Sequence, residues 1–253
     1  IPGHEFLLRC MCAYDVIGFH TAGDLAAFQT CVREPIIGGD FLDRNRIKVP
    51  GGELIIGVDR LDYSKGLMQR FLSYERLLEK YPNAQKVVTL MQIAPPTRTG
   101  VRAYDDIRSE LEQASGRING RFAETNWVPI RYLNKGVARK PLMGFFRNAS
   151  VALVTPLRDG MNLVAKEFMA AQDPEDPGMV VLSSLAGAAR ELTDAVIVNP
   201  YDRDDVADGI ATAINMPVEE RRERYESMMA ILRKNDITAW RTRFVDALLK
   251  KRS

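Results

Sequence analysis

The sequence predicts an α/β fold built on a parallel β-sheet, and two observations lead to that prediction. Short apolar runs rich in β-branched residues recur along the chain, and segments of helix-forming residues separate them. Such alternation is typical of parallel strands joined by right-handed helical crossovers. With 253 residues, 46% of them hydrophobic, the chain has enough apolar material for one large domain or two small ones.

The predicted strands share three features: they are about four to eight residues long, they are apolar, and loop-forming residues follow them. The first contains Leu-Ile-Ile-Gly-Val and ends at Asp59, and the fourth contains Val-Ala-Leu-Val and ends at Thr155. In chain order the strands are predicted at 54–59, 86–93, 127–133, 151–155, 179–182 and 195–198.

The predicted helices combine apolar residues at helical spacing with charged residues on a solvated face. Asp202, Asp204 and Asp205 open the fifth helix, where carboxylates favour the positive end of the helix dipole. Asp202 and Asp204 could instead bind a divalent ion, but capping is the simpler interpretation. The last helix should break around Asn235, and the glycines of 116–120 predict a turn. In chain order the helices are predicted near 67–78, 102–114, 139–147, 163–171, 204–215 and 218–249.

The loop between the strand at 151–155 and the helix that begins at Leu163 is able to hold a charged ligand. The first N–H groups of a helix are unpaired and its dipole adds positive charge there, so a phosphate fits this junction. One turn further, Glu167 can accept two hydrogen bonds from a diol such as a ribose. The loop therefore suits a sugar nucleotide. An ordinary connection, capped by Asp159 or Asn162, is the alternative.

A second charged loop follows the strand at 54–59 and contains Arg60 and Lys65. Ligands of open parallel sheets bind outside the carboxyl ends of the strands, where this loop lies. Arginine offers a planar fork to two phosphate oxygens and lysine a mobile point charge, so the pair could neutralise a diphosphate. Two cations in a loop are otherwise commonly solvated.

Two motifs resemble the donor site of the trehalose-6-phosphate synthase family: Val58-Asp-Arg-Leu-Asp-Tyr-Ser-Lys-Gly66 and Thr155-Pro-Leu-Arg-Asp-Gly-Met-Asn-Leu-Val-Ala-Lys-Glu167. Five further stretches resemble the same family in the same order, so the match covers essentially the whole chain. They are Tyr14-Asp-Val-Ile-Gly-Phe-His-Thr21, Gln92-Ile-Ala-Pro-Pro96, Gly116-Arg-Ile-Asn-Gly120, Tyr132-Leu-Asn134 and Val198-Asn-Pro-Tyr-Asp-Arg203.

The resemblance implies a retaining glycosyltransferase with two facing Rossmann-like domains. It would move glucose from UDP-glucose, or a related nucleotide sugar, to glucose 6-phosphate and so form trehalose 6-phosphate. This chain would be the carboxyl-terminal, donor-binding half, a Rossmann-like parallel sheet with helices on both faces.

The resemblance also implies roles for single residues. Arg60 and Lys65 would hold the donor diphosphate, and Asp159 would be the third catalytic residue. Glu167 would take the ribose hydroxyls. The transferred glucose would face Asp159 and the backbone of Gly160, Met161 and Asn162, and the diphosphate would lie under the N–H groups of Leu163, Val164, Ala165 and Lys166.

Two implied contacts lie outside these motifs. Arg98 matches a family arginine directed at the acceptor phosphate. Val137 occupies a loop position that the family uses against the nucleotide base, often with an aromatic residue. The preference for uridine or guanosine stays open, because base recognition there would use backbone groups.

The family also has an amino-terminal acceptor domain that we expect to be largely absent, so we expect this chain to be a carboxyl-terminal fragment. Residues 1–50 would be a remnant of that domain and of the link, with 36–39 at most a trace of an interdomain strand. Residues 51–253 would form the nucleotide-sugar-binding domain, and the helices at 218–250 could cross back to the acceptor domain. The activity of this chain alone stays open.

Composition narrows the partners and the compartment. Thirty-five basic and 33 acidic residues, mixed along the chain, leave a formal charge of +2, so no basic stripe indicates nucleic acid. No apolar run approaches the roughly 20 residues that span a bilayer, and no leader opens the sequence, so we expect no membrane partner and a cytoplasmic protein. Whether it forms a homo-oligomer stays open.

The cysteines and histidines predict neither a disulfide nor a metal site. Cys10, Cys12 and Cys31 are an odd number, and with only His4 and His20 they match no recognisable zinc spacing. His20 is better explained by packing or loop capping. The resemblance likewise implies a metal-independent transferase with no cofactor beyond its nucleotide-sugar substrate.

For the mechanism, we expect the acceptor to attack on the face from which the diphosphate departs, rather than a double displacement through a carboxylate. Two other functions stay open. One is a non-catalytic nucleotide-sugar-binding module, and the other is a synthase-like transferase with a different phosphorylated acceptor.

Overall fold

The computed structural model describes residues 26–28, 30, 40–43, 46–48, 52–85, 87–97, 102–125 and 127–250. The chain divides into two compact units, Ile1–Gly52 and Glu53–Ser253. In the first unit, β1 (Asp40–Asp43) pairs antiparallel with β2 (Arg46–Lys48). Sequence patterns missed this ribbon, because both strands are very short and carry charged residues where a buried strand would be apolar.

The second unit contains a six-stranded sheet in which all neighbouring strands are parallel. All six predicted strands are confirmed, with ends shifted by a few residues at most. Their order across the sheet is β5 (Ile130–Leu133), β4 (Val88–Ile93), β3 (Glu53–Val58), β6 (Val151–Val154), β7 (Met179–Ser183) and β8 (Val196–Val198). Every residue of β6 and β7 is buried, as expected for parallel strands covered on both faces.

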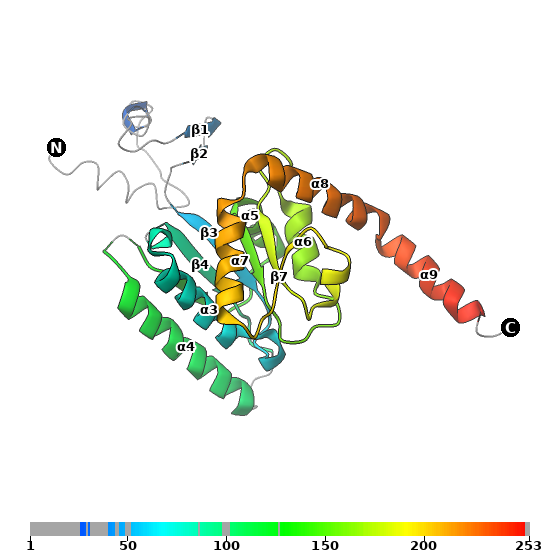
Figure 1. Cartoon of the computed structure of the whole chain (residues 1–253), viewed down its shortest axis with the longest axis horizontal. Helices are drawn as coiled ribbons and strands as arrows, with labels where there is room; N and C mark the ends of the chain where they lie inside the picture. Colours follow the sequence, from blue (N-terminus) through cyan, green and yellow to red (C-terminus); the bar gives the residue numbers. More distant parts are fainter. Residues whose placement is uncertain are drawn as a thin grey trace. The chain divides into compact units, whose positions relative to one another are not determined.

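Helices cover both faces of this sheet, so the predicted Rossmann-like α/β fold is confirmed (Figure 1). On one face, α3 (Leu67–Lys80) packs between α4 (Arg102–Phe122) and α7 (Arg203–Asn215). On the other, α5 (Arg139–Asn148) packs against α6 (Leu163–Ala171), and α6 against α8 (Val218–Lys234). The predicted break near Asn235 is also confirmed, since α9 (Ile237–Lys250) follows α8 as a separate helix.

The core lies between the sheet and these helices. The predicted apolar positions of α3, among them Phe71 and Tyr74, are fully buried. Tyr74 also satisfies its hydroxyl by donating a hydrogen bond to the carbonyl of Val88 in β4 (2.8 Å). On the opposite face Phe146 and Phe168 meet edge to face, with ring centroids 5.9 Å apart. Tyr74 thus fastens α3 to β4, and the two phenylalanines join α5 to α6.

The final helix α9 differs from the others because its apolar side chains are exposed. Trp240 and Phe244 stack on each other with centroids 5.2 Å apart, and both are about half exposed. Ile237, Val245, Leu248 and Leu249 are exposed as well. No helix in the described part of the chain is long and apolar enough to cross a membrane.

The turn predicted at 116–120 is wrong, because these residues lie inside α4. Ile118 is fully buried, and Arg117 donates two hydrogen bonds to the carboxylate of Glu75 in α3 (2.5 and 2.7 Å). These tertiary contacts outweigh the low helix propensity of Gly116 and Gly120. Arg117 therefore joins two helices within this unit.

The start of α7 confirms capping. Asp202 accepts hydrogen bonds from the backbone N–H groups of Asp204 (2.9 Å) and Asp205 (3.2 Å), which leaves its carboxylate committed to the helix. The cysteine and histidine expectations, by contrast, concern residues 4, 10, 12, 20 and 31, and these lie outside the described residues together with 36–39.

The link between α3 and α4 should make stability depend on pH. Hydrogen bonds from Arg117, opposed by burial and aided by Arg121, hold the pKa of Glu75 below its ordinary value near 4.5. The stabilisation is complete above the pKa of the unfolded chain and is lost as the pH falls through the lower pKa of the folded state. We expect Glu75→Gln to lower the free energy of unfolding at pH 7 by about 1 kcal/mol, because its partners are half exposed.

Urea denaturation at pH 7 and at several values below 4.5 measures this effect, and the difference between wild type and variant should shrink on acidification. Glu112→Gln is the matched control, because Glu112 is an exposed residue of α4 whose ion pair with Arg108, at 3.9 Å, lies within that helix and does not join it to α3. A difference for Glu75→Gln that is independent of pH would contradict the assignment.

Candidate functional site

The candidate site lies where the loops after β3 and β6 meet. These strands are neighbours in the sheet, so their carboxyl ends lie side by side. The carbonyl of Ser64 accepts hydrogen bonds from the N–H groups of Leu157 (2.8 Å) and Arg158 (3.3 Å). Gly66, with φ +63°, passes so close that a Cβ on it would stand 2.8 Å from the carbonyl oxygen of Thr155. The two predicted ligand loops therefore form one structure.

A salt bridge joins two of the predicted site residues. The Nζ of Lys65 lies 2.6 Å from Oδ2 of Asp159, and both side chains are 16% exposed. Burial tends to raise the pKa of Asp159, but Lys65, the N–H of Met161 and the amide of Asn162 outweigh burial, so the pKa lies below its ordinary value. Asp159 is therefore a carboxylate at neutral pH. It is paired with Lys65, the cation that an anionic ligand would also contact.

The start of α6 has a side-chain cap and an open end. Asn162 adopts φ 78° and ψ 92°, and its side-chain oxygen accepts a hydrogen bond from the N–H of Ala165 (3.2 Å). Its amide donates to Asp159 (3.1 Å), which fixes the cap against the salt bridge. The expected cap at Asn162 is therefore present. The N–H groups of Leu163 and Val164 precede the first helical hydrogen bond and point out of the helix end.

A third loop, after β7, braces the second one, and the sequence did not predict it. The N–H of Gly187 donates to the carbonyl of Asp159 (3.0 Å), and the N–H of Ala188 donates to that of Met161 (2.7 Å). A Cβ on Gly187 would run into the carbonyl of Gly160. The only signal in the sequence was a glycine shortly after a strand, which is too common to indicate a brace.

These elements surround a hollow of about 390 Å³, a size suited to a small ligand. Arg60 is exposed and makes no hydrogen bond or ion pair with any described residue, so its guanidinium is available. Asp59, which was not predicted as a site residue, contributes a buried carboxylate to the wall. The residues that line the hollow are Asp59, Arg60, Lys65, Asp159, Met161, Asn162, Leu163 and Val164.

The other predicted site residues are not among those that line the hollow. Glu167 is exposed on the first turns of α6, and Lys166 there pairs with Glu191 (3.0 Å). Gly160 is exposed beside Asp159. Val137 lies in the loop between β5 and α5, partly buried against the core. Arg98 lies outside the described residues.

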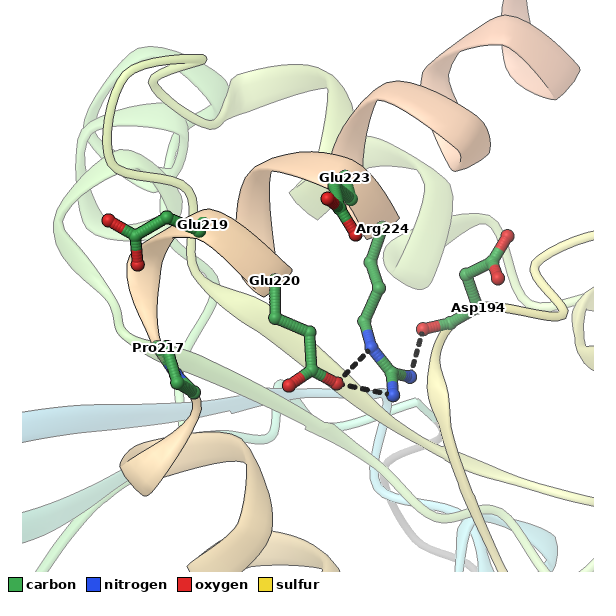
Figure 2. A pocket seen from close by; sticks show the side chains of 6 residues that line it. All are labelled: Asp194, Pro217, Glu219, Glu220, Glu223 and Arg224. Atoms are coloured by element: carbon green, nitrogen blue, oxygen red, sulfur yellow. Dashed lines mark hydrogen bonds and ion pairs between the residues drawn. The ribbon is translucent and has the colours of Figure 1, made fainter.

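A larger hollow, about 680 Å³, lies beside the first turns of α8 (Figure 2). Arg224 is its single cation, and this side chain donates to the carboxylate of Glu220 (2.7 and 2.9 Å) and to the carbonyl of Asp194 (3.0 Å). Glu219 and Glu223 add further carboxylates. Because negative charge dominates, this hollow does not suit a phosphorylated ligand, and none of the predicted site residues lines it.

The chemistry of the smaller hollow follows from its charges. Arg60 offers a fork of N–H donors, Lys65 an ammonium group, and the start of α6 offers backbone N–H groups with a favourable dipole. Such a set can hold a diphosphate and stabilise it as a leaving group. Among the described residues, no three or more histidine, cysteine or acidic side chains gather to hold a metal ion.

Comparison with known proteins gives a consistent result. The model of glycosyltransferase family 20 matches residues 43–250. A trehalose-6-phosphate synthase of Klebsiella pneumoniae is 47% identical over 98% of this chain and 60% of its own length. The chain thus spans about three fifths of the curated relative that it matches.

Two similar solved structures contain ligands. An E. coli structure bound with UDP-2-fluoro glucose is 42% identical, with a TM-score of 0.77 over 98% of this chain and 63% of that one. An alpha,alpha-trehalose-phosphate synthase (UDP-forming) of Burkholderia xenovorans, in complex with glucose-6-phosphate, is 44% identical, with a TM-score of 0.76 over 98% and 64%.

The brace at Gly187 can be tested through stability. We expect Gly187→Ala to lower the free energy of unfolding by about 1 kcal/mol or more, because the added methyl group must push the backbone of Gly160 away. Gly136→Ala is the control, since a Cβ there meets nothing within 4 Å. Denaturant titration measures both variants, and equal midpoints would mean that the loop is not braced at this position.

Proposed function

Since this chain belongs to glycosyltransferase family 20, we propose that it carries the donor site of a retaining glycosyltransferase. The reaction moves glucose from UDP-glucose to glucose 6-phosphate and forms trehalose 6-phosphate. The observation that carries the proposal is the hollow at the carboxyl ends of β3 and β6, where Arg60, Lys65 and the start of α6 offer positive charge together. The ligands of the E. coli and Burkholderia xenovorans structures support both substrates.

The diphosphate of the donor lies against these three groups. The Nζ of Lys65 lies 2.6 Å from Oδ2 of Asp159, and this contact orients the ammonium group, so it loses little conformational freedom on binding. Arg60 is exposed and closes over the second phosphate with its fork. The N–H groups of Leu163 and Val164 supply the remaining donors, and Lys166 and the capped Ala165 lie further along the same helix.

The hydroxyl groups of the donor's two sugars, ribose and glucose, donate hydrogen bonds to oxygen atoms of the site. Glu167, exposed on α6, accepts hydrogen bonds from the ribose hydroxyls. Asp159 and the backbone from Gly160 to Asn162 face the transferred glucose. The brace from the third loop holds that backbone, so the acceptors keep fixed angles. Val137, in the loop after β5, lies against the base.

The reaction proceeds on one face of the glucose. The bond between C1 and the diphosphate oxygen breaks while the acceptor hydroxyl forms a new bond to C1 on the same side. A phosphate oxygen of the leaving diphosphate accepts the proton of that hydroxyl. Arg60 and Lys65 stabilise the charge that develops on the leaving group, which lowers the barrier electrostatically. Asp159 orients the glucose rather than attacking it.

Most of the acceptor site belongs to the part of the relatives that this chain does not span. The chain covers 60% of the Klebsiella pneumoniae relative, and we propose that the remaining length supplies a second Rossmann-like domain that binds glucose 6-phosphate, with Arg98 at its phosphate. The exposed apolar side chains of α9, Trp240 and Phe244 among them, support a crossing of the final helices to that domain.

Calorimetric titration of this chain with UDP and UDP-glucose tests the donor site. We expect Arg60→Ala and Lys65→Ala each to weaken binding roughly 10- to 100-fold, because a hydrogen bond to a charged group contributes about 1.5 to 3 kcal/mol. Arg233→Ala and Lys234→Ala are matched controls, because these exposed cations lie at the end of α8 and line neither hollow. Equal affinity of parent and Arg60→Ala would exclude the proposed contact.

Transfer itself, as we propose it, also needs the part of the relatives that this chain does not match. A chimera joins this chain to the part of the Klebsiella pneumoniae relative that it does not match, and release of UDP in the presence of glucose 6-phosphate is measured. We expect turnover that Arg60→Ala reduces by at least about 100-fold. A chimera that binds UDP-glucose but never turns over would favour a non-catalytic binding module. Turnover only with another sugar phosphate would show that the acceptor is not glucose 6-phosphate.

A further inference from the structure

A buried arginine lies directly beneath the proposed donor site. Arg70, in the first turn of α3, is fully buried and is the largest such side chain among the described residues. Its Nη2 lies 2.8 Å from Oδ2 of Asp59, its Nε donates to Oγ1 of Thr155 (3.1 Å), and its Nη1 donates to Oε1 of Gln92 (3.0 Å). One guanidinium group thus contacts three different strand ends.

These three contacts involve β4, β3 and β6, which are adjacent strands at the centre of the sheet. Asp59 is the first residue after β3, Thr155 is the first after β6, and Gln92 is next to last in β4. Gln92 stands opposite Gly57 in the register, and a Cβ on Gly57 would run into the amide of Gln92. The side chain of Gln92 therefore reaches Arg70 only because residue 57 has no side chain.

Stability alone does not account for this arrangement. Burying a charged pair costs desolvation that apolar packing would avoid, and replacing such a pair with well-packed apolar residues is often neutral or stabilising. Burial raises the pKa of Asp59, and Arg70 opposes the rise. The role of the buried ion pair therefore lies in the segments of chain that Asp59 and Arg70 hold in place.

Both ligand loops start at partners of Arg70. Asp59 lines the hollow and precedes Arg60, while Thr155 begins the loop that leads to Asp159. Arg70 is also only a few residues beyond Lys65 on the same segment of chain, and its N–H bonds to the carbonyl of Gly66 (2.9 Å). The loop of Arg60, the loop of Asp159 and the segment of Lys65 are thus all connected to one rigid planar group.

We propose that Arg70 is a positioning residue of the donor site, which sets the separation between the loop of Arg60 and Lys65 and the loop of Asp159. It contacts no ligand itself. The proposal rests on the proposed function, because the distance between these loops matters only if one ligand bridges them. Thr155 and Gln92 act as the second and third anchors of the same group.

The test separates affinity from stability. Thr155→Val removes the anchor to the second loop and leaves the ion pair between Arg70 and Asp59 in place. Arg70→Lys keeps the charge near Asp59 but loses the fork that reaches Thr155 and Gln92. For each variant, the dissociation constant of UDP-glucose is measured by calorimetry well below the thermal midpoint, and the midpoint itself by circular dichroism.

We expect both variants to bind UDP-glucose about tenfold more weakly than the parent while they remain folded. The control is Leu78→Ala, a fully buried position near the other end of α3, which should lower the midpoint at least as much and leave the affinity unchanged. The double variant Asp59→Asn, Arg70→Met removes the buried charges. Its thermal midpoint should lie above that of Arg70→Lys, but its affinity for UDP-glucose should stay below that of the parent.

The outcomes distinguish the two proposals. If the parent chain does not bind UDP-glucose, the proposed function fails and the role of Arg70 fails with it. If the parent binds and both Thr155→Val and Arg70→Lys bind equally well, Arg70 is only a structural residue. Should Arg70→Lys not fold, Thr155→Val decides the question alone. Affinity that returns together with stability in the double variant would also overturn the positioning role.

Discussion

The parallel pairing of β3 with β6 is the constraint on which the rest of this unit depends. Strands β3, β4 and β5 follow one another toward one edge of the sheet, and β6, β7 and β8 follow one another toward the other. The connections on either side of the β3–β6 pair therefore diverge, which opens a crevice at the carboxyl ends of these two strands. Every charged group of the candidate site is carried by the two loops that leave this crevice, or by the helices that follow them.

This topology explains why the sequence predicted the candidate site from loops far apart in the chain. Arg60 and Asp159 are separated by about a hundred residues, yet each follows an apolar run that ends a strand. A local signal was enough to identify each loop, and the general rule for parallel sheets brought them to one edge. The register of Ile55 against Val151 then decides how closely they meet, and register is a tertiary property that no local pattern contains.

The elements that the sequence missed share a physical cause. The segment 116–120 contains two glycines, yet contacts from Arg117 and Ile118 to the neighbouring layer keep it helical. The brace by Gly187 depends on two backbone carbonyls of another loop. Arg70 was indistinguishable from a solvated helix cation until the strands around it were known. In each case the decisive interaction partner lies far away in the sequence, and composition does not reveal it.

The network around Arg70 has a consequence for how the sheet assembles. A buried polar network with some partners missing is less favourable than none at all, because the unpaired groups keep their desolvation cost. Docking α3 before β4 and β6 are in place would leave a dehydrated guanidinium with one or two of its three partners. Partly assembled forms of the sheet centre thus carry an energetic penalty, so β3, β4, β6 and α3 should form and melt as one cooperative block. The same residues that set the spacing of the two loops therefore also make the centre of the domain fold in an all-or-none manner.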